Sequence, residues 1–419
     1  MCGINGVIDL NSFYAPKFID QALKAIQHRG YDGYGKTIAH HTHMLTKHKL
    51  GLVEPGKKET GNIAIGHIRY KTSGSVELKS CQPFANEQFA IVHNGQIESD
   101  TTPDSLRLFH YFEKSSLKQE ELFYIVSDIM KEVKGSYSCI VLVPGVGLLA
   151  FRDPQGIRPL LYHIDKKKIV ITSENCGWAN CIDIRPGECV LFRLDGTKTS
   201  RQLADPNPHP CVFEYIYFAH PLSILNGISV QVLRRQLGMM LGQHIQKTFP
   251  ALEIDYIVPV PQSACLGTQA LAEQLHKPYR NVLMVTEDRS TRSFIQSTPE
   301  KREQRVKRKF RLTSDIIKGK SVLLADDSIF RSTTSKHVVK LFKEAGARKI
   351  VFCSLAPPVV HRNIYGIDVP NEDQLVACKG QPVHELIGAD QVIYQPFESL
   401  PLLSEQYQTA FEQSMFVKT

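Results

Sequence analysis

Two groups of residues in this sequence have types and spacing that suit catalysis. The first is Cys2, which follows the initiator Met1. Removal of Met1 would give Cys2 a free α-amino group of pKa ~8, so that one residue supplies a thiol nucleophile and its base. The second is the acidic pair Asp326 and Asp327, which follows four apolar residues. Carboxylates at the end of a strand suit sugar hydroxyls and a hard cation such as Mg²⁺.

The residues around this acidic pair predict a strand, a tight loop and a helix. Residues 322–325 are apolar and typical of a buried parallel strand, and residues 328–335 form a short, hydroxyl-rich loop. The apolar residues of 335–346 recur with helical spacing. A loop that leads into a helix binds anions, because unpaired backbone N–H groups and the helix dipole point at it. The sequence therefore predicts a phosphate site beside the carboxylates.

The stretch from 322 to 335 resembles the signature of the type I phosphoribosyltransferases. In that family the two acids hold the ribose and magnesium of phosphoribosyl pyrophosphate, and the loop after them holds its 5′-phosphate. The resemblance gives the first role to Asp326 and Asp327. It gives the phosphate-binding role to four residues of the loop: Arg331, Ser332, Thr333 and Thr334.

Four segments after Cys2 resemble, in order, those of the class II glutamine amidotransferases, the N-terminal-nucleophile glutaminases. They are HRGYDGYG at 28–35, GHIRYKTSGS at 66–75, CQPFANEQFAIVHNGQIES at 81–99 and DS at 104–105. The resemblance implies that Cys2 attacks the side-chain amide of glutamine. Asn94 and Gly95 would form the oxyanion hole, since a side-chain N–H and a backbone N–H can point at one developing oxyanion. Arg69 would bind the α-carboxylate of glutamine as a bidentate fork, and Asp104 its α-ammonium group.

Segments farther along narrow the resemblance to the amidophosphoribosyltransferase family, the glutamine-dependent enzymes that open purine synthesis. They are RDPQGIRPL at 152–160, SEN at 173–175, DIRPGE at 183–188 and CVFEYIYFAHPLS at 211–223. The resemblance implies that ammonia released from glutamine travels inside the protein and attacks the anomeric carbon of phosphoribosyl pyrophosphate. It also implies a homo-oligomer, with purine nucleotides as candidate inhibitors.

Two further segments extend the second predicted site. Residues 254–275 predict a strand, a turn and a helix, which supports a parallel sheet. In the family this turn places a hydroxyl near the metal and the pyrophosphate, a role that falls on Ser263, so the predicted Mg²⁺ residues are Ser263, Asp326 and Asp327. Residues 286–310 resemble the family's mobile lid, and Arg292 matches the part of the lid that binds phosphoribosyl pyrophosphate.

Length and composition agree with two domains. A chain of 419 residues exceeds one ordinary core, and 42% hydrophobic with 22% charged residues is usual for a globular protein. The proline-rich stretch 204–210 marks a boundary. We predict an α+β, N-terminal-nucleophile (αββα) glutaminase domain over 1–208. An α/β, parallel-sheet domain of the type I phosphoribosyltransferase class follows over 209–419.

Several partners and cofactors are not expected. The most apolar run is broken by proline and glycine, so no membrane partner is predicted, and no basic leader precedes an apolar run, which favours the cytoplasm. No cysteine follows Cys378, so an iron–sulfur cluster is not expected. The net charge of +8 and the basic residues of 301–311 suit phosphates, but no aromatic platform accompanies them, so nucleic acid is not predicted.

Five departures from the family's pattern lie in the second half of the chain, at His220, Leu222, Gln262, Thr291 and Ser332, whereas the glutaminase segments are nearly intact. Ser332 replaces a glycine, and a loop position that needs positive φ costs any other residue about 1 kcal/mol or more. These departures leave two alternatives open. The second domain could be a nucleotide or phosphate sensor attached to a glutaminase, or it could use a different phosphorylated sugar as acceptor.

Overall fold

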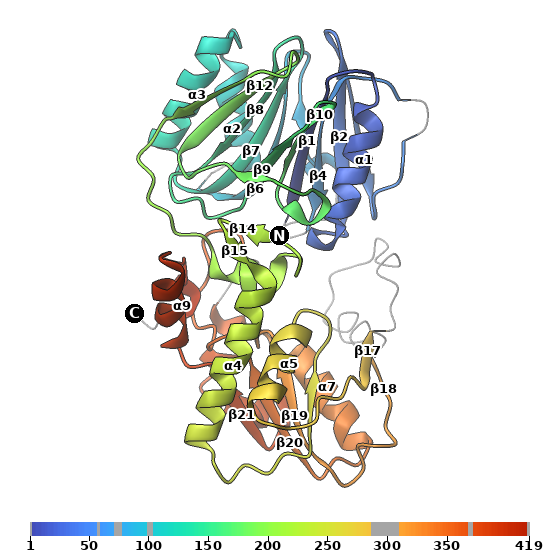
Figure 1. Cartoon of the computed structure of the whole chain (residues 1–419), viewed down its shortest axis with the longest axis vertical. Helices are drawn as coiled ribbons and strands as arrows, with labels where there is room; N and C mark the ends of the chain where they lie inside the picture. Colours follow the sequence, from blue (N-terminus) through green and yellow to red (C-terminus); the bar gives the residue numbers. More distant parts are fainter. Residues whose placement is uncertain are drawn as a thin grey trace.

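The computed structural model describes residues 2–56, 59–70, 78–98, 104–285, 310–367 and 372–416. Its elements fall into two blocks that lie one above the other in Figure 1. The first block comprises the described residues through β13, and the second comprises those from residue 211 onward. Strand β1 begins beside the junction of the two blocks, close to the label N in Figure 1.

The first block contains a seven-stranded antiparallel sheet in the order β11-β9-β10-β1-β4-β2-β3. Central strand β1 is buried along its whole length. The bounds are β1 (Gly3–Asp9), β2 (Gly33–His40), β3 (His43–Leu50), β4 (Ile63–Arg69), β9 (Leu161–Ile164), β10 (Lys168–Thr172) and β11 (Ile182–Asp183). Helix α1 (Ala15–Ala25) packs on one face through Ile19 and Leu23. The apolar spacing of residues 16–28 predicts a helix over that range. The α-helix ends earlier, at Ala25, and the chain continues as a 3-10 turn, Gln27–Arg29.

A second antiparallel sheet, in the order β13-β12-β8-β7-β6-β5, packs on the other face of the first. Its strands are β5 (Phe84–Ala85), β6 (Ala90–Ile97), β7 (Gly135–Val143), β8 (Gly147–Arg152), β12 (Glu188–Arg193) and β13 (Lys198–Gln202). Helices α2 (Ser105–Glu113) and α3 (Gln119–Glu132) cover its outer face. The block is thus layered helix, sheet, sheet, helix. The sequence predicts a helix over 120–133 and a pair of strands over 136–153, and the structure confirms both.

The second block is built on a parallel sheet in the order β16-β19-β20-β21, which confirms the predicted sheet type. The strands are β16 (Tyr256–Pro259), β19 (Ser321–Asp326), β20 (Lys349–Ser354) and β21 (Gln391–Tyr394). Two antiparallel pairs lie outside this sheet: β14 (Ile224–Leu225) with β15 (Ile228–Ser229), and β17 (Leu283–Val285) with β18 (Phe310–Leu312). The helices are α4 (Val230–Thr248), α5 (Cys265–Gln274), α7 (Thr333–Glu344), α8 (Val383–Ile387) and α9 (Ser399–Tyr407).

Strand β19 is buried on both faces, which explains its continuous apolar run. Val322 and Leu324 pack against α7, while Leu323 and Ala325 face the core shared with α4 and α5. A strand covered by helices on both sides can expose functional groups only at its ends. The acidic pair lies at such an end.

The junction between the blocks has its own apolar core. Ile157 and Leu161 of the first block share it with Phe213, Leu233 and Leu400 of the second. The chain crosses the junction after β13 and makes a short π-helical turn, Glu214–Phe218. These contacts hold the blocks together over a broad surface.

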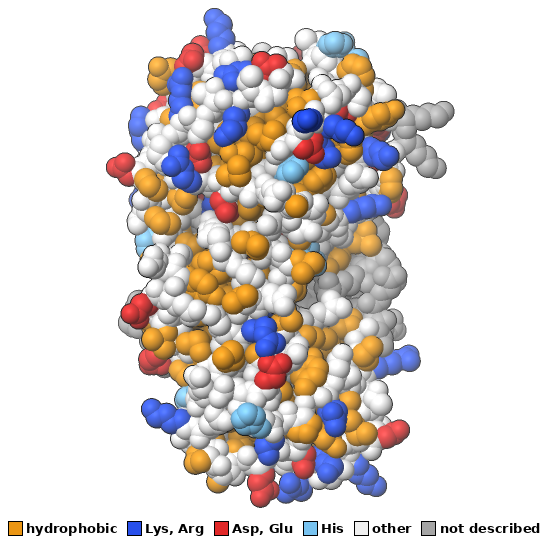
Figure 2. All heavy atoms as spheres, viewed as in Figure 1, with side chains coloured by type: hydrophobic (Ala, Val, Ile, Leu, Met, Phe, Trp, Pro, Cys, Tyr) orange, Lys and Arg blue, Asp and Glu red, His pale blue; other side chains and the backbone are white. Residues whose placement is uncertain are grey.

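None of the helices in the described part of the chain is long and apolar enough to cross a membrane. Figure 2 shows basic and acidic side chains interspersed over one face of the molecule. Most of the basic run over 301–311 lies outside the described residues, so the prediction of no nucleic acid stays a prediction.

Two glycines of α4 give a sharp test of the packing between α4 and α5. A Cβ at Gly238 would overlap the backbone carbonyl of Gly267, whereas a Cβ at Gly242 would meet side-chain atoms of Gln274 and Leu271 but no backbone atom. We predict that Gly238→Ala lowers the free energy of unfolding by about 1–3 kcal/mol, because the helices must separate. Gly242→Ala should cost far less, since alanine gains up to about 1 kcal/mol of helix propensity. Urea unfolding of both variants checks this, and equal losses would contradict the backbone contact.

Candidate active sites

Cys2 lies where the first sheet meets the junction. Antiparallel pairing sets Gly3 opposite Ile68, so Cys2 lies at the level of Arg69, the last residue of β4. The Cys2 side chain is half-buried, and its Sγ lies 3.8 Å from the carbonyl oxygen of Tyr70. The Arg69 guanidinium donates a hydrogen bond to the carbonyl of Ser80. A thiol and a guanidinium therefore lie at the same end of two neighbouring strands, where a small amino acid with a carboxylate could bind.

Asn94 and Gly95 lie side by side on β6, in the second sheet. The Asn94 side chain is buried, and neither its nitrogen nor its oxygen has a hydrogen-bond partner among the described residues. A buried amide left unpaired costs about 1–3 kcal/mol, so this group is well suited to donate to a ligand. Gly95 has a φ of 150°, and a Cβ there would overlap the carbonyl of Ser136. Only glycine fits this position.

Asp104 directly precedes α2 and is tied to the same strand. Its Oδ2 accepts a hydrogen bond from the backbone N–H of Ile97, at the end of β6, at 3.1 Å. A carboxylate has about four acceptor positions, so Asp104 can still accept hydrogen bonds from an ammonium group. The structure thus ties Asp104 to the strand that carries the predicted oxyanion-hole residues.

The second block reaches this strand directly. The Ser136 hydroxyl on β7 donates to the carbonyl of Tyr365 at 2.9 Å. The neighbouring Gly366 has a φ of 105°, and a Cβ there would lie 3.4 Å from the carbonyl of Gly95. Residues of the second block therefore pack against the predicted oxyanion hole.

Sequence reasoning missed two buried histidines in this region. His67 lies on β4, and neither of its ring nitrogens has a partner within the described ranges. Burial, reinforced by Arg69 and His93, lowers the pKa of His67 well below its usual value. His93 precedes Asn94 and contacts the Ser105 hydroxyl at 2.9 Å, and burial lowers its pKa as well. Both imidazoles are therefore neutral at pH 7. In the sequence, these two histidines stand out only as polar residues within apolar runs.

The structure brings the three predicted metal residues together. Asp326 ends β19, and the backbone N–H of Asp327 donates to the Asp326 Oδ1 at 2.9 Å. The Ser263 hydroxyl, from the turn between β16 and α5, donates to one oxygen of Asp327. The Ser328 hydroxyl donates to the other at 2.6 Å. The pair is therefore held in place at the end of the parallel sheet.

These oxygen donors fit a magnesium ion that shares its ligands with a substrate. Magnesium in phosphate-binding sites is held by one or two carboxylates together with phosphate oxygens, not by a cage of protein ligands. Among the described residues, no group of three or more His, Cys, Asp or Glu side chains could hold a metal. Asp326 and Asp327 are nearly buried and lie at a strand end, as such a shared site requires.

The predicted phosphate loop also has the expected geometry. Helix α7 begins at Thr333 and continues through Thr334, directly after Arg331 and Ser332. Its first turn points its backbone N–H groups toward the loop that carries the acidic pair. Ser332 has a φ of 62°, the left-handed conformation that favours glycine. Arg292, the predicted contact from the lid, lies outside the described residues.

Arg234 is a further residue that sequence reasoning missed. It is buried on α4 and donates to the carbonyls of Tyr215 at 2.8 Å and Ala219 at 2.8 Å. Burial lowers the pKa of Arg234 to about 10, although the nearby Asp327 carboxylate opposes this shift. Arg234 thus hydrogen-bonds to the junction segment and lies close enough to Asp327 for the two charges to attract each other.

Ser332 provides a test of the loop geometry. We predict that Ser332→Gly raises the free energy of unfolding by about 1 kcal/mol, because glycine adopts positive φ without strain. Ser335→Gly, three residues later and inside α7, should lower it by a similar amount, since glycine is a poor helix former. Chemical denaturation of the two variants measures both effects. A loss of stability in Ser332→Gly would mean that the loop does not need positive φ.

The chain is similar to known proteins in both sequence and structure. The chain is 34% identical to the amidophosphoribosyltransferases of Pasteurella multocida and Escherichia coli, over 96% of this chain and 88% of each relative. The glutamine phosphoribosylpyrophosphate amidotransferase of B. subtilis, complexed with ADP and GMP, matches 99% of this chain and 94% of that one, with a TM-score of 0.82 and 28% identity. A structure of the allosteric regulatory enzyme of purine biosynthesis matches with a TM-score of 0.86, at 28% identity and over 99% and 95% of the two chains. No model of a known protein family matches.

Proposed function

The chain belongs to the amidophosphoribosyltransferase family, and from this we propose that it transfers ammonia from glutamine to phosphoribosyl pyrophosphate. The products are 5-phosphoribosylamine, glutamate and pyrophosphate, and the reaction is the first step of purine synthesis. The observation that carries the proposal is the buried carboxamide of Asn94, which lies beside Gly95 and has no hydrogen-bond partner among the residues that the structure describes. Such a pair of donors suits an acyl-transfer reaction, in which an oxyanion develops.

In the first half of the proposed reaction, Cys2 attacks the side-chain amide carbon of glutamine. The α-amino group of Cys2 accepts the thiol proton and returns it to the leaving nitrogen, so that ammonia departs and a thioester remains. Asn94 and Gly95 stabilise the oxyanion, while Arg69 and Asp104 hold the carboxylate and ammonium groups of glutamine. Water then hydrolyses the thioester to glutamate and restores the thiol.

In the second half, ammonia attacks the anomeric carbon of phosphoribosyl pyrophosphate and pyrophosphate leaves. Asp326 and Asp327 bind the ribose hydroxyls and, with Ser263, would hold Mg²⁺. The ion would neutralise charge on the departing pyrophosphate. The 5′-phosphate lies at the start of α7, where four residues bind it: Arg331, Ser332, Thr333 and Thr334. Arg292 would contact the same substrate. Transfer inside the protein keeps ammonia from becoming ammonium, which has no free electron pair.

We assign these half-reactions to separate domains, 1–208 and 209–419. The helix, sheet, sheet, helix layering and the central position of β1 support an N-terminal-nucleophile fold for the first. The parallel sheet with helices on both faces supports a type I phosphoribosyltransferase fold for the second. A homo-oligomer, a cytoplasmic location and the lack of an iron–sulfur cluster remain predictions. The relative complexed with ADP and GMP supports the binding of purine nucleotides, and their role as inhibitors remains a prediction.

Release of both products tests the proposed function. Purified protein given glutamine, Mg²⁺ and phosphoribosyl pyrophosphate should release glutamate and pyrophosphate in equal amounts. Glutamate without pyrophosphate would instead indicate a glutaminase whose second domain senses a ligand or uses another phosphorylated sugar. Binding of phosphoribosyl pyrophosphate without turnover would favour the sensor.

A cysteine variant tests whether the two half-reactions take place at separate sites. We predict that Cys2→Ala abolishes glutamine-dependent synthesis but leaves synthesis from added ammonium salts, because only the ammonia source is lost. Cys181→Ala, at another half-buried cysteine, should retain both activities. Pyrophosphate release with each nitrogen source measures the outcome. Loss of both activities in a folded Cys2→Ala protein would contradict two separate sites.

A further inference from the structure

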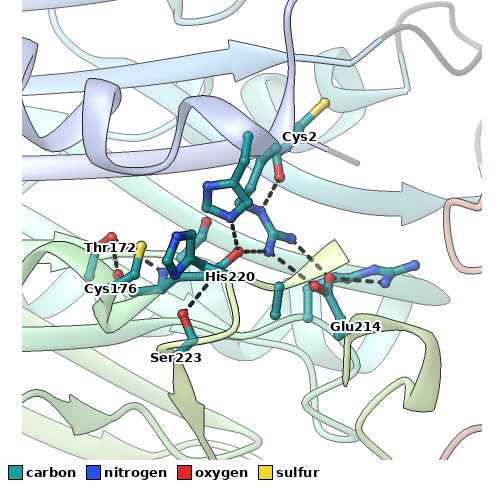
Figure 3. A network of polar contacts seen from close by, with 12 residues as sticks. Cys2, Thr172, Cys176, Glu214, His220 and Ser223 are labelled. Atoms are coloured by element: carbon teal, nitrogen blue, oxygen red, sulfur yellow. Dashed lines mark hydrogen bonds and ion pairs between the residues drawn. The ribbon is translucent and has the colours of Figure 1, made fainter. Parts of the chain in front are cut away.

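Arg29 links the nucleophile to a network of buried charges at the junction of the two blocks (Figure 3). Its Nε donates to the backbone carbonyl of Cys2 at 2.8 Å. One terminal nitrogen, Nη1, donates to Glu174 and, at 3.0 Å, to Glu214, and Nη2 donates to Glu214 at 2.9 Å. Arg29 is 2% exposed. Its guanidinium is therefore held on three sides and cannot turn without breaking an ion pair.

The carboxylates that hold Arg29 receive support from both blocks. Glu174 Oε1 also contacts His28 at 2.9 Å. Its Oε2 accepts hydrogen bonds from the backbone N–H of His220 and from the hydroxyl of Ser223, each at 2.7 Å. His220 and Ser223 belong to the second block, so this block fixes a carboxylate that in turn fixes the arginine beside Cys2. Figure 3 shows Ser223 on the far side of the network from Cys2.

The network is close to electroneutral and stays ionised. Arg158 donates to Glu214 at 3.1 Å, so two arginines face two glutamates. Burial alone would raise the pKa of Glu174, but His28 and Arg29 outweigh it and lower that pKa far below its usual range. Burial alone would lower the pKa of Arg29, but Glu214 and Glu174 raise it. Fixed charges at contact distance hold their geometry more firmly than neutral groups do.

We propose that Arg29 is a positioning residue for Cys2, and that Ser223 of the second block sets its orientation through Glu174. This inference rests on the proposed function of Cys2 as the nucleophile. The hydrogen bond from Arg29 fixes the peptide group of Cys2, to which both the thiol and the α-amino group are attached through one carbon. Attack on glutamine requires the sulfur within a narrow distance and angle of the amide carbon. The second block therefore completes the support of a nucleophile that lies in the first.

A purely structural role for the network makes a different prediction. A buried ion pair often adds little net stability, because the desolvation of both charges offsets their attraction. If the network only held the blocks together, its loss would change the stability and both activities alike. If it positions Cys2, its loss lowers the turnover of glutamine alone. The affinity for glutamine should change little, since Arg69 and Asp104 bind that substrate in the proposed mechanism.

The test uses Ser223→Ala with Ser399→Ala as its matched control. Both serines are buried in the second block, and both hydroxyls hydrogen-bond to side chains: Ser223 donates to Glu174, and Ser399 accepts from Gln395. We expect Ser223→Ala to lower kcat for glutamine hydrolysis about ten-fold, with KM for glutamine within about two-fold. Synthesis from ammonium salts should stay at the wild-type rate. Ser399→Ala should leave both nitrogen sources unaffected.

The outcomes separate this inference from the proposed function. A wild-type kcat in folded Ser223→Ala would overturn the positioning role, and so would an equal loss of activity with glutamine and with ammonium. Absence of glutamine hydrolysis in the wild-type protein would overturn the proposed function itself. A second variant, Arg29→Lys, keeps the charge but cannot bridge two carboxylates and a carbonyl. It should lower kcat for glutamine by about 100-fold, again without changing ammonium-dependent synthesis.

Discussion

The pairing of buried charges at the junction is the constraint on which the arrangement of the two blocks depends. Arg29 and Arg158 face Glu174 and Glu214 in a region that water does not reach. Removal of one partner would leave an uncompensated charge, which costs about 3–5 kcal/mol. The two blocks must therefore meet in one orientation, the orientation that satisfies all four charges. Because Arg29 also donates a hydrogen bond to Cys2, the way the blocks meet also affects the position of Cys2, just before β1.

Cys2, Arg69 and the acidic pair lie at the ends of strands, and for the same physical reason. The middle of β19 is covered on both faces, and β1 is covered by α1 and by the second sheet. Side chains there can only pack. At the strand ends the backbone leaves the sheet, so polar groups can reach a ligand while the sheet keeps them fixed. Ser332 has a positive φ beside the acidic pair, and Gly95, which lies within β6, has a positive φ beside Asn94.

The fold could be predicted from the sequence wherever a local pattern decides it. The apolar run of β19 and the helical spacing of α7 locate the strand, loop and helix, and the structure confirms them. The end of α1 was placed too late, because apolar spacing does not reveal where an α-helix becomes a 3-10 turn. His67, Arg29 and Arg234 were not found as site residues, because each is significant only through partners that are distant in the chain.

By itself, the sequence determined the chemical groups that are available: a cysteine beside the chain's first residue, an acidic pair at a strand end, and a hydroxyl-rich loop before a helix. These depend on neighbours in the chain, whose geometry follows from backbone sterics. Only the tertiary structure decided which charges pair. Arg29 meets Glu174 across 145 residues, and Glu174 meets Ser223 across 49. The chain has many other carboxylates and hydroxyls that could pair with these groups. The pairs that form are those whose members are buried together at the junction.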